Sequence, residues 1–204
     1  MRKFKFINTK SAFITGRRWL VFLLVTFFLV GCSSQKLVLK KGITLDTLRI
    51  SLVFTPEVPD QIAAELDLQL SNFIIRHNAA SKKMKILQVD GQEISDLQIR
   101  VLASALVTEQ QQTAGVVVSM LGLSLPFIMA SAGSEFVIFF WYFPKVNSVM
   151  ELSLDPELNG GPLNPIHVNL SSPGFLKKPE RQVAKHGIYF NDYLGRLVNG
   201  LQKR

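Results

Sequence analysis

Apolar and polar positions recur with two different periods along the chain, and each period predicts one kind of element. Residues 47–54 alternate strictly, which is typical of a half-buried strand, and residues 85–89 form a second, shorter strand pattern. Between them, apolar residues recur at helical spacing from Ile62 to Ile74, after the helix-start sequence PEVPD at 56–60. The first half of the chain therefore predicts a strand–helix–strand unit.

A second helix is expected from Ser95, which can cap it, with Gln98 three residues later completing a capping box. An apolar stripe at helical spacing supports this helix: Ile94, Leu97, Val101, Leu102, Ala105 and Leu106. Further along, alternation over 149–155 and over 166–170 predicts two strands. An amphipathic stripe over 190–201 predicts a closing helix. The order indicates a mixed α/β fold, with a βαβ-like N-terminal half and antiparallel strands in the C-terminal half.

Residues 114–143 contain a single charge, Glu135, and we interpret them as two elements. Residues 114–133 are an apolar helical segment. Residues 135–143 are β-branched and aromatic, which favours a buried central strand. Pro144 stops this strand, and 144–148 would form the loop of a hairpin to the 149–155 strand.

The apolar helical segment 114–133 is as long as a bilayer is thick, about 30 Å for twenty helical residues. Its small residues Gly115, Ser119 and Gly122 resemble those at membrane-helix contacts. No Lys or Arg lies close to either end, however, and Pro126 interrupts the run. We favour a buried helical hairpin that bends near Pro126, or an oligomer contact, and keep one membrane span as the alternative. Gly115, Ser119, Gly122 and Pro126 are the candidate contact residues.

The chain begins like an exported protein. Six basic residues precede an apolar run at 19–30, and small residues follow it. The sequence Leu29-Val30-Gly31-Cys32 resembles the lipobox of bacterial prolipoproteins. The resemblance implies cleavage before Cys32, a diacylglycerol on its thiol and an acylated new amino terminus. It also implies that Ser33 permits sorting to the outer membrane. An uncleaved signal anchor is the alternative.

Three regions follow from this interpretation: a signal peptide at 1–31, a lipidated tether at 32–41, and a single mixed α/β periplasmic domain at 42–204. In its topology alone, the predicted domain is similar to the periplasmic domains of secretion-associated lipoproteins. Removal of the leader changes the charge, because six of the 23 basic residues and none of the 15 acidic residues lie in the first eighteen positions. The net charge falls from +8 to +2. Nucleic acid is therefore not an expected partner.

Motifs for chemistry are missing from the sequence. Cys32 is the only cysteine, no G-x-S-x-G elbow occurs, and His77, His167 and His186 lack metal-ligand spacing. We expect no enzyme activity, no metal and no cofactor beyond the covalent lipid on Cys32. The expected function is an outer-membrane lipoprotein facing the periplasm, an assembly or accessory subunit of an envelope complex. Its expected partners are the membrane and either envelope proteins or further copies of itself. The alternatives are a carrier for an apolar envelope molecule and a membrane-embedded subunit that spans once at 114–133.

Overall fold

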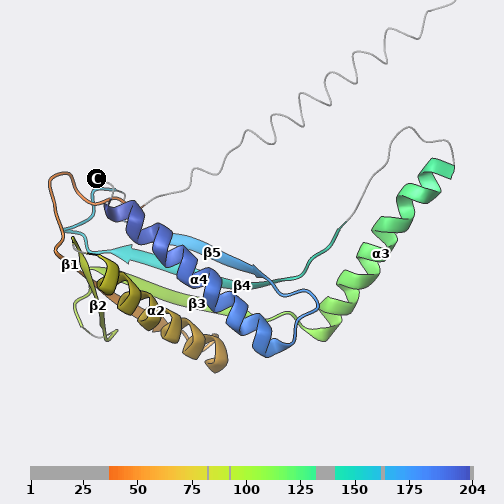
Figure 1. Cartoon of the computed structure of the whole chain (residues 1–204), viewed down its shortest axis with the longest axis horizontal. Coiled ribbons are helices and arrows are strands. Elements are labelled where there is room, and N and C mark those ends of the chain that lie inside the picture. The colour runs from red at the N-terminus through yellow and green to blue at the C-terminus, as the bar shows by residue number, and fades with distance from the viewer. Residues whose placement is uncertain (1–36, 82, 92, 132–140, 162–163, 203–204) are drawn as a thin grey trace, which may run out of the picture. The chain divides into compact units, whose positions relative to one another are not determined.

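The computed structural model describes residues 37–81, 83–91, 93–131, 141–161 and 164–202, with the backbone alone for 126–131. A compact unit extends from Lys36 to Arg204. Its elements follow the order β1 (Thr47–Phe54), α2 (Asp60–Ala80), β2 (Lys85–Val89), β3 (Leu97–Ala105), α3 (Glu109–Ser131), β4 (Lys145–Leu154), β5 (Ile166–Pro173) and α4 (Pro179–Gln202). Figure 1 labels them.

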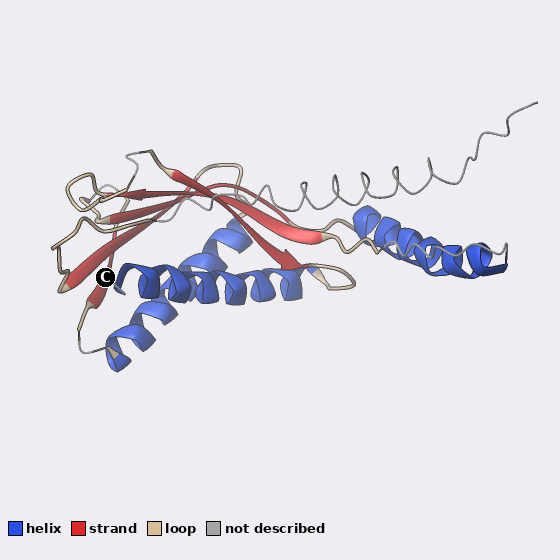
Figure 2. Cartoon of the chain, turned by 90° about the horizontal axis from the view of Figure 1, so that it is seen from above, coloured by secondary structure: helices blue, strands red, loops and turns tan. Residues whose placement is uncertain are grey.

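The five strands form one mixed sheet in the order β2-β1-β3-β4-β5. β1 pairs in parallel with β2 and with β3, whereas β3–β4 and β4–β5 are antiparallel. Helices α2 and α4 cover one face of this sheet (Figure 2). The predicted α/β class is confirmed, with a βαβ unit in the first half and antiparallel strands in the second. The helical segment expected at 114–133 is also present as α3.

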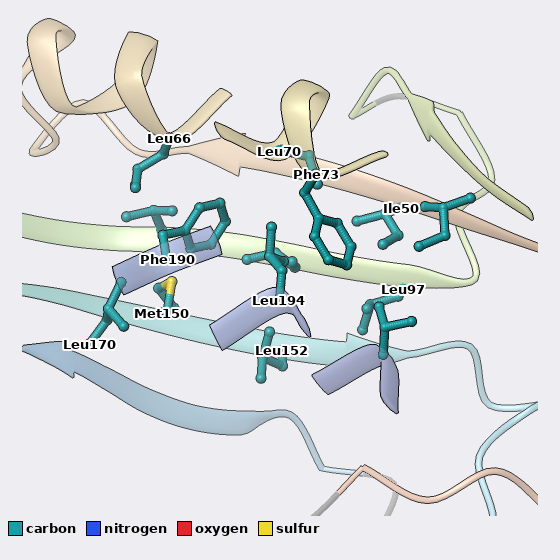
Figure 3. Close-up of a cluster of buried hydrophobic side chains, with 14 of the residues drawn as sticks. Ile50, Leu66, Leu70, Phe73, Leu97, Met150, Leu152, Leu170, Phe190 and Leu194 are labelled. Atoms are coloured by element: carbon teal, nitrogen blue, oxygen red, sulfur yellow. The ribbon is translucent and has the colours of Figure 1, made fainter. Parts of the chain in front are cut away.

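The core lies between the sheet and the two covering helices (Figure 3). Alternate residues of β1, β3 and β4 point into it, and α2 and α4 each contribute one apolar stripe. Its fully buried members include Leu48, Ile50, Leu66, Leu70, Leu97, Ile99, Met150, Phe190 and Leu194. Full burial of one such side chain contributes about 1.5–3 kcal/mol. None of the described side chains of α3 belongs to this core.

One predicted helix is a strand. The segment expected to begin as a helix at Ser95 forms β3, in which Leu97, Ile99 and Val101 are fully buried. Its apolar residues fit both periods, but β-branched Ile99 and Val101 favour a strand, and β1 and β4 supply hydrogen-bonding partners on both edges. The Ser95 hydroxyl accepts a hydrogen bond from Ser51 at 2.9 Å and caps no helix.

The connection between β2 and β3 is unusually short for two strands that both run parallel to β1. Parallel strands generally need a crossover of a dozen or more residues to return to the starting end. Here the strands are staggered, because Val89 at the end of β2 pairs with Ser51, while Leu97 at the start of β3 pairs with Ile50. Residues 90–96 therefore pass from one edge of β1 to the other without running back along its length.

Asp96 fastens this crossover to β1. Its carboxylate accepts hydrogen bonds from the backbone N–H of Arg49 at 2.7 Å and from the Arg49 guanidinium at 2.8 Å. The backbone N–H of Asp96 donates to the Arg49 carbonyl at 2.9 Å. Burial disfavours the charged carboxylate, but these hydrogen bonds and the charge of Arg49 outweigh burial and lower the pKa of Asp96.

The hairpin expected between 135–143 and 149–155 differs in the structure. Residues 135–140 lie outside the described residues, and Trp141–Phe143 belong to no strand. β4 begins at Lys145, within the expected loop, and its two neighbours are β3 and β5. Since a strand has only two edges, a strand at 135–143 has no edge of β4 left to pair with.

Part of the expected tether packs on the domain. Leu39 forms a β-bridge with Asn159, and the N–H of Gly160 donates to the carbonyl of Val38 at 2.7 Å. Leu37 and Leu39 pack against the core. The folded unit therefore begins nearer to Cys32 than the predicted boundary at residue 42. Cys32 and Ser33 themselves lie outside the described residues.

Candidate functional site

Helix α3 is the most unusual surface of the described chain, because its exposed side chains are apolar. Exposed fractions are 65% for Met120, 58% for Leu121 and 49% for Val117. Val118, Leu123 and Leu125 are exposed as well. No charged residue follows Glu109 within the helix. A helix that is apolar on most of its circumference is ordinarily buried in a protein or in lipid, so this exposure requires an explanation.

The start of α3 is fixed by a reciprocal cap. The N–H of Gln111 donates to the Thr108 hydroxyl at 3.2 Å, and the N–H of Thr108 donates to the Gln111 side-chain oxygen at 3.1 Å. This is a capping box, and its spacing, Thr108 followed three residues later by Gln111, is visible in the sequence. The helix therefore begins before Ala114, where the apolar run begins.

The hairpin expected to bend near Ser124 and Pro126 is not formed. The backbone of α3 is helical from Glu109 to Ser131, and Pro126 lies within it. Proline removes one hydrogen bond and disfavours a helix interior, but it can kink a helix without ending it. The Ser124 hydroxyl donates to the Leu121 carbonyl at 2.9 Å within the same helix. The expected burial is also wrong, as the exposed side chains above show.

Two of the small residues predicted as candidate contacts, Gly115 and Ser119, face the chain's own returning segment. Gly115 is buried, and a Cβ there would lie 2.9 Å from the Pro144 ring and 3.0 Å from the Phe175 ring. The Ser119 hydroxyl donates to the Tyr142 carbonyl at 3.4 Å. Gly122 is buried as well. Only a residue without a side chain lets the helix backbone approach Pro144 this closely.

Aromatic side chains surround this contact, and we call Trp141, Tyr142, Phe143, Phe175 and Leu176 the collar. Trp141 stacks on Phe143 with ring centroids 6.0 Å apart, and Phe143 meets Phe175 edge-on at 5.4 Å. Trp141, Tyr142 and Phe143 are about half exposed, at 55%, 44% and 49%. Leu176 is 68% exposed and has a φ of 54°, a conformation that bulky residues rarely adopt.

A buried glutamine links the start of α3 to the 174–178 turn, which carries Phe175 and Leu176 of the collar. The Gln182 side chain accepts from the N–H of Val107 at 2.8 Å and donates to its carbonyl at 3.2 Å. It also donates to the Lys177 carbonyl at 2.8 Å, and the Gln112 side chain of α3 donates to the same carbonyl at 3.0 Å. The first turns of α3 and the 174–178 turn are thus linked through shared backbone groups.

A second polar cluster lies inside the core. The ring nitrogens of His186 contact the hydroxyls of Ser148 at 2.7 Å and Ser172 at 2.8 Å, and Ser148 also contacts Ser104 at 2.5 Å. His186, Ser148 and Ser172 are at most 1% exposed. Burial lowers the pKa of His186 to about 4, so the ring is neutral at neutral pH. A serine beside a histidine is the pairing of a nucleophile and its base, but both ring nitrogens are occupied and no solvent reaches them. This cluster positions α4 on the sheet.

The other predicted histidines lie apart. His77 is in the last turn of α2 and contacts the Met84 carbonyl at 3.1 Å, whereas His167 is exposed on β5. Among the described residues, no three His, Cys, Asp or Glu side chains gather closely enough to hold a metal ion. A pocket lies beside residues 37–43, which we call the docked segment, next to Gly160 and Leu201, and no described side chain of α3 lines it.

Sequence reasoning missed the collar and the His186 cluster, because both join segments that are distant in the chain. The capping box at Thr108 was the one local signal that could have located the start of α3. Within the described ranges, no helix combines the length and the hydropathy required to cross a membrane. Comparison with known proteins places the chain in no group: no protein-family model matches it, and no curated protein matches it.

Proposed function

We propose that the protein is a lipid-anchored lipoprotein on the periplasmic face of the outer membrane. In this proposal it acts as a non-enzymatic assembly or accessory subunit of an envelope complex. The observation that carries the anchor is the sequence Leu29-Val30-Gly31-Cys32 after a basic, apolar leader. Acyl chains on the Cys32 thiol and on the new amino terminus would together hold the protein stably on a bilayer.

The short linker supports this assignment. Leu37 already packs against the core, and only four residues separate it from Cys32. At 3.3–3.6 Å per residue, this linker reaches at most about 18 Å. A lipid on Cys32 would therefore keep the folded unit next to the membrane surface. A short linker suits a subunit whose protein partners also lie at the membrane surface.

The exposed surface of α3 supports a role in contacts within the envelope, either with a protein partner or with the membrane itself. None of its described side chains belongs to the core, and the six large apolar side chains between Val117 and Leu125 are exposed. Their exposure to water is unfavourable, by about 25 cal/mol for each Å². A surface retained at that cost is typical of an interaction site.

The anchor is tested by producing the full chain in a bacterium and measuring the mass of its N-terminal peptide. We expect cleavage before Cys32 and the added mass of three acyl chains. Cys32→Ser should abolish the lipid, while Ser34→Ala is the matched control that should retain it. Ser33→Asp should keep the lipid but retain the protein in the inner membrane. An unmodified Cys32 in the mature protein would exclude the lipoprotein.

The accessory role is tested separately by crosslinking in cells. An assembly subunit should give a discrete species of higher mass with identifiable protein partners. A monomer that copurifies with an apolar molecule would instead establish the carrier alternative. Loss of the chain should leave envelope enzyme activities intact and destabilise the complex that it joins.

A further inference from the structure

We propose that α3 and the collar insert into the surface of a lipid bilayer, as a second membrane contact beside the lipid anchor. The inference deepens the proposed function, from which it takes the presence of a bilayer. It concerns the partner of α3, and the contact does not require that Cys32 be acylated. The described residues support it through the distribution of apolar side chains, the collar and the charges at the base of the helix.

The exposed apolar residues are not confined to one side of α3. At 100° per residue, they cover an arc of about 220°, from Leu123 round to Val118. The remaining arc holds Gly115 and Ser119, which contact the chain's own Pro144 and Tyr142, and the buried Gly122. A protein partner or a second copy that packed on one face would leave the rest of this arc in water. Lipid surrounds an inserted helix from every free side.

The collar has the composition of a membrane–water interface. Trp141 and Tyr142 combine an apolar ring with one polar atom, and such side chains are enriched at the level of the lipid head groups. Both are about half exposed, and the Tyr142 carbonyl accepts a hydrogen bond from Ser119 near the middle of the helix. Leu176 projects from the neighbouring turn, where its positive φ presents an apolar side chain to solvent at a conformational cost.

The base of α3 also carries an excess of positive charge. Lys177 and Lys178 follow Leu176 directly, in the turn that Gln112 of α3 contacts. Lys145 follows Pro144, and Arg181 lies in the first turn of α4. Within the segments 109–115, 141–145 and 174–181, these four cations outnumber the two carboxylates, Glu109 and Glu180. An anionic lipid surface attracts such a cluster by about 1 kcal/mol for each basic residue.

The fold supplies the basic flank that the apolar segment lacks along the linear sequence. No Lys or Arg flanks the apolar segment closely along the chain, which counted against a membrane contact. The fold brings Lys177 and Lys178, more than sixty residues from Gln112, to the base of the helix. The basic flank is therefore present in space.

Both contacts constrain how the domain lies on the membrane. The docked segment 37–43 precedes β1, whereas α3 follows β3, and these two strands are parallel. The docked segment and α3 thus lie at opposite ends of the sheet, about 25 Å apart for eight residues of β1. Because the linker to Cys32 is shorter than this span, the sheet must lie along the bilayer for both contacts to form.

Trp141 provides a direct test. The sequence contains two tryptophans, Trp19 in the leader and Trp141 in the collar. Trp19→Phe therefore leaves Trp141 as the only tryptophan fluorophore, even in chains that retain the leader. This full-length variant, carrying its native lipid, is reconstituted into vesicles of phosphatidylethanolamine and phosphatidylglycerol. Half of the preparations contain lipids brominated on their acyl chains. We expect Trp141 emission to shift to shorter wavelength and to be quenched by the bromines.

Matched substitutions locate the contact. Met120→Asp should reduce the inserted population about tenfold, because a charge in hydrocarbon is strongly disfavoured. Ile75→Asp is the control, since Ile75 is equally exposed, at 67%, on α2. Lys177→Glu with Lys178→Glu should weaken quenching in anionic vesicles and have little effect in vesicles of phosphatidylcholine alone.

Two results would overturn the inference. Unquenched Trp141 in vesicle-bound protein would place the collar outside the lipid. A blue shift without bromine quenching, together with a crosslinked dimer or heteromer through Met120, would assign α3 to a protein partner. The mass of the N-terminal peptide keeps the two proposals separable. Quenching without lipid on Cys32 removes the anchor alone, and lipid without quenching removes the α3 contact alone.

Discussion

His186 makes one buried side chain sensitive to acid. In the folded chain the neutral ring contacts Ser148 and Ser172, and burial lowers its pKa to about 4 from an ordinary 6.5. Between these values the unfolded chain binds a proton that the folded chain does not, so unfolding becomes easier as the pH falls. The contribution of His186 is complete above about pH 6.5 and lost below about pH 4. We expect the free energy of unfolding to fall by about 3 kcal/mol across this window.

Urea unfolding at a series of pH values measures this slope, and two variants identify its source. His186→Asn should be less stable at neutral pH but should lose most of the slope. His167→Gln, at an exposed position on β5, should keep it. A wild-type slope in the His186→Asn variant would assign the acid sensitivity to other groups.

At the scale of single elements, the crossover between β2 and β3 depends on Asp96. Asp96→Ala leaves the N–H of Arg49 without its acceptor, and the unpaired group costs about 1–3 kcal/mol of unfolding free energy. The Arg196–Asp192 pair on α4 is the matched comparison, because its side chains are 69% and 70% exposed. Asp192→Ala should change stability by less than about 0.5 kcal/mol. Chemical denaturation measures the free energy of unfolding of both variants. A larger loss for Asp96→Ala would show that the buried position of Asp96 makes its hydrogen bonds important for stability, and equal losses would contradict this explanation.

The same region shows where local patterns fail. The alternation of apolar and polar residues locates β1 and β2, and helical spacing locates α2 and α4. In each of these segments the apolar residues fit only one of the two periods. The residues of β3 fit both a strand and a helix, and only the edges offered by β1 and β4 distinguish them. α3 was predicted as a helix from its apolar run. Its exposure, its collar and its basic flank depend on residues 141–144 and 174–178, which no local pattern connects to it.

At the scale of the whole molecule, the docked segment 37–43 determines how far the domain can move from its anchor. Gly160 holds this segment, because its N–H donates to the Val38 carbonyl and its α-carbon faces the backbone of Leu39 and Lys40. A Cβ at Gly160 would lie 2.7 Å from the Lys40 α-carbon and 2.8 Å from the Leu39 carbonyl oxygen. Backbone atoms cannot yield as a flexible side chain does, so Gly160→Ala must displace the segment.

We therefore expect Gly160→Ala to release residues 37–43 while the core stays folded. Hydrogen exchange of the amides of Lys40 and Ile43, which bond to Leu158 and Lys40 carbonyls, should accelerate selectively. Gly200→Ala is the control, since a Cβ there meets nothing within 4 Å, and it should stabilise α4 by about 0.5–1 kcal/mol. Release lengthens the linker from Cys32 by several residues, enough for the domain to rise from the bilayer. If the short linker to Cys32 strengthens the membrane contact of α3, bromine quenching of Trp141 should then decrease. Unchanged quenching would show that α3 binds the membrane without help from the linker.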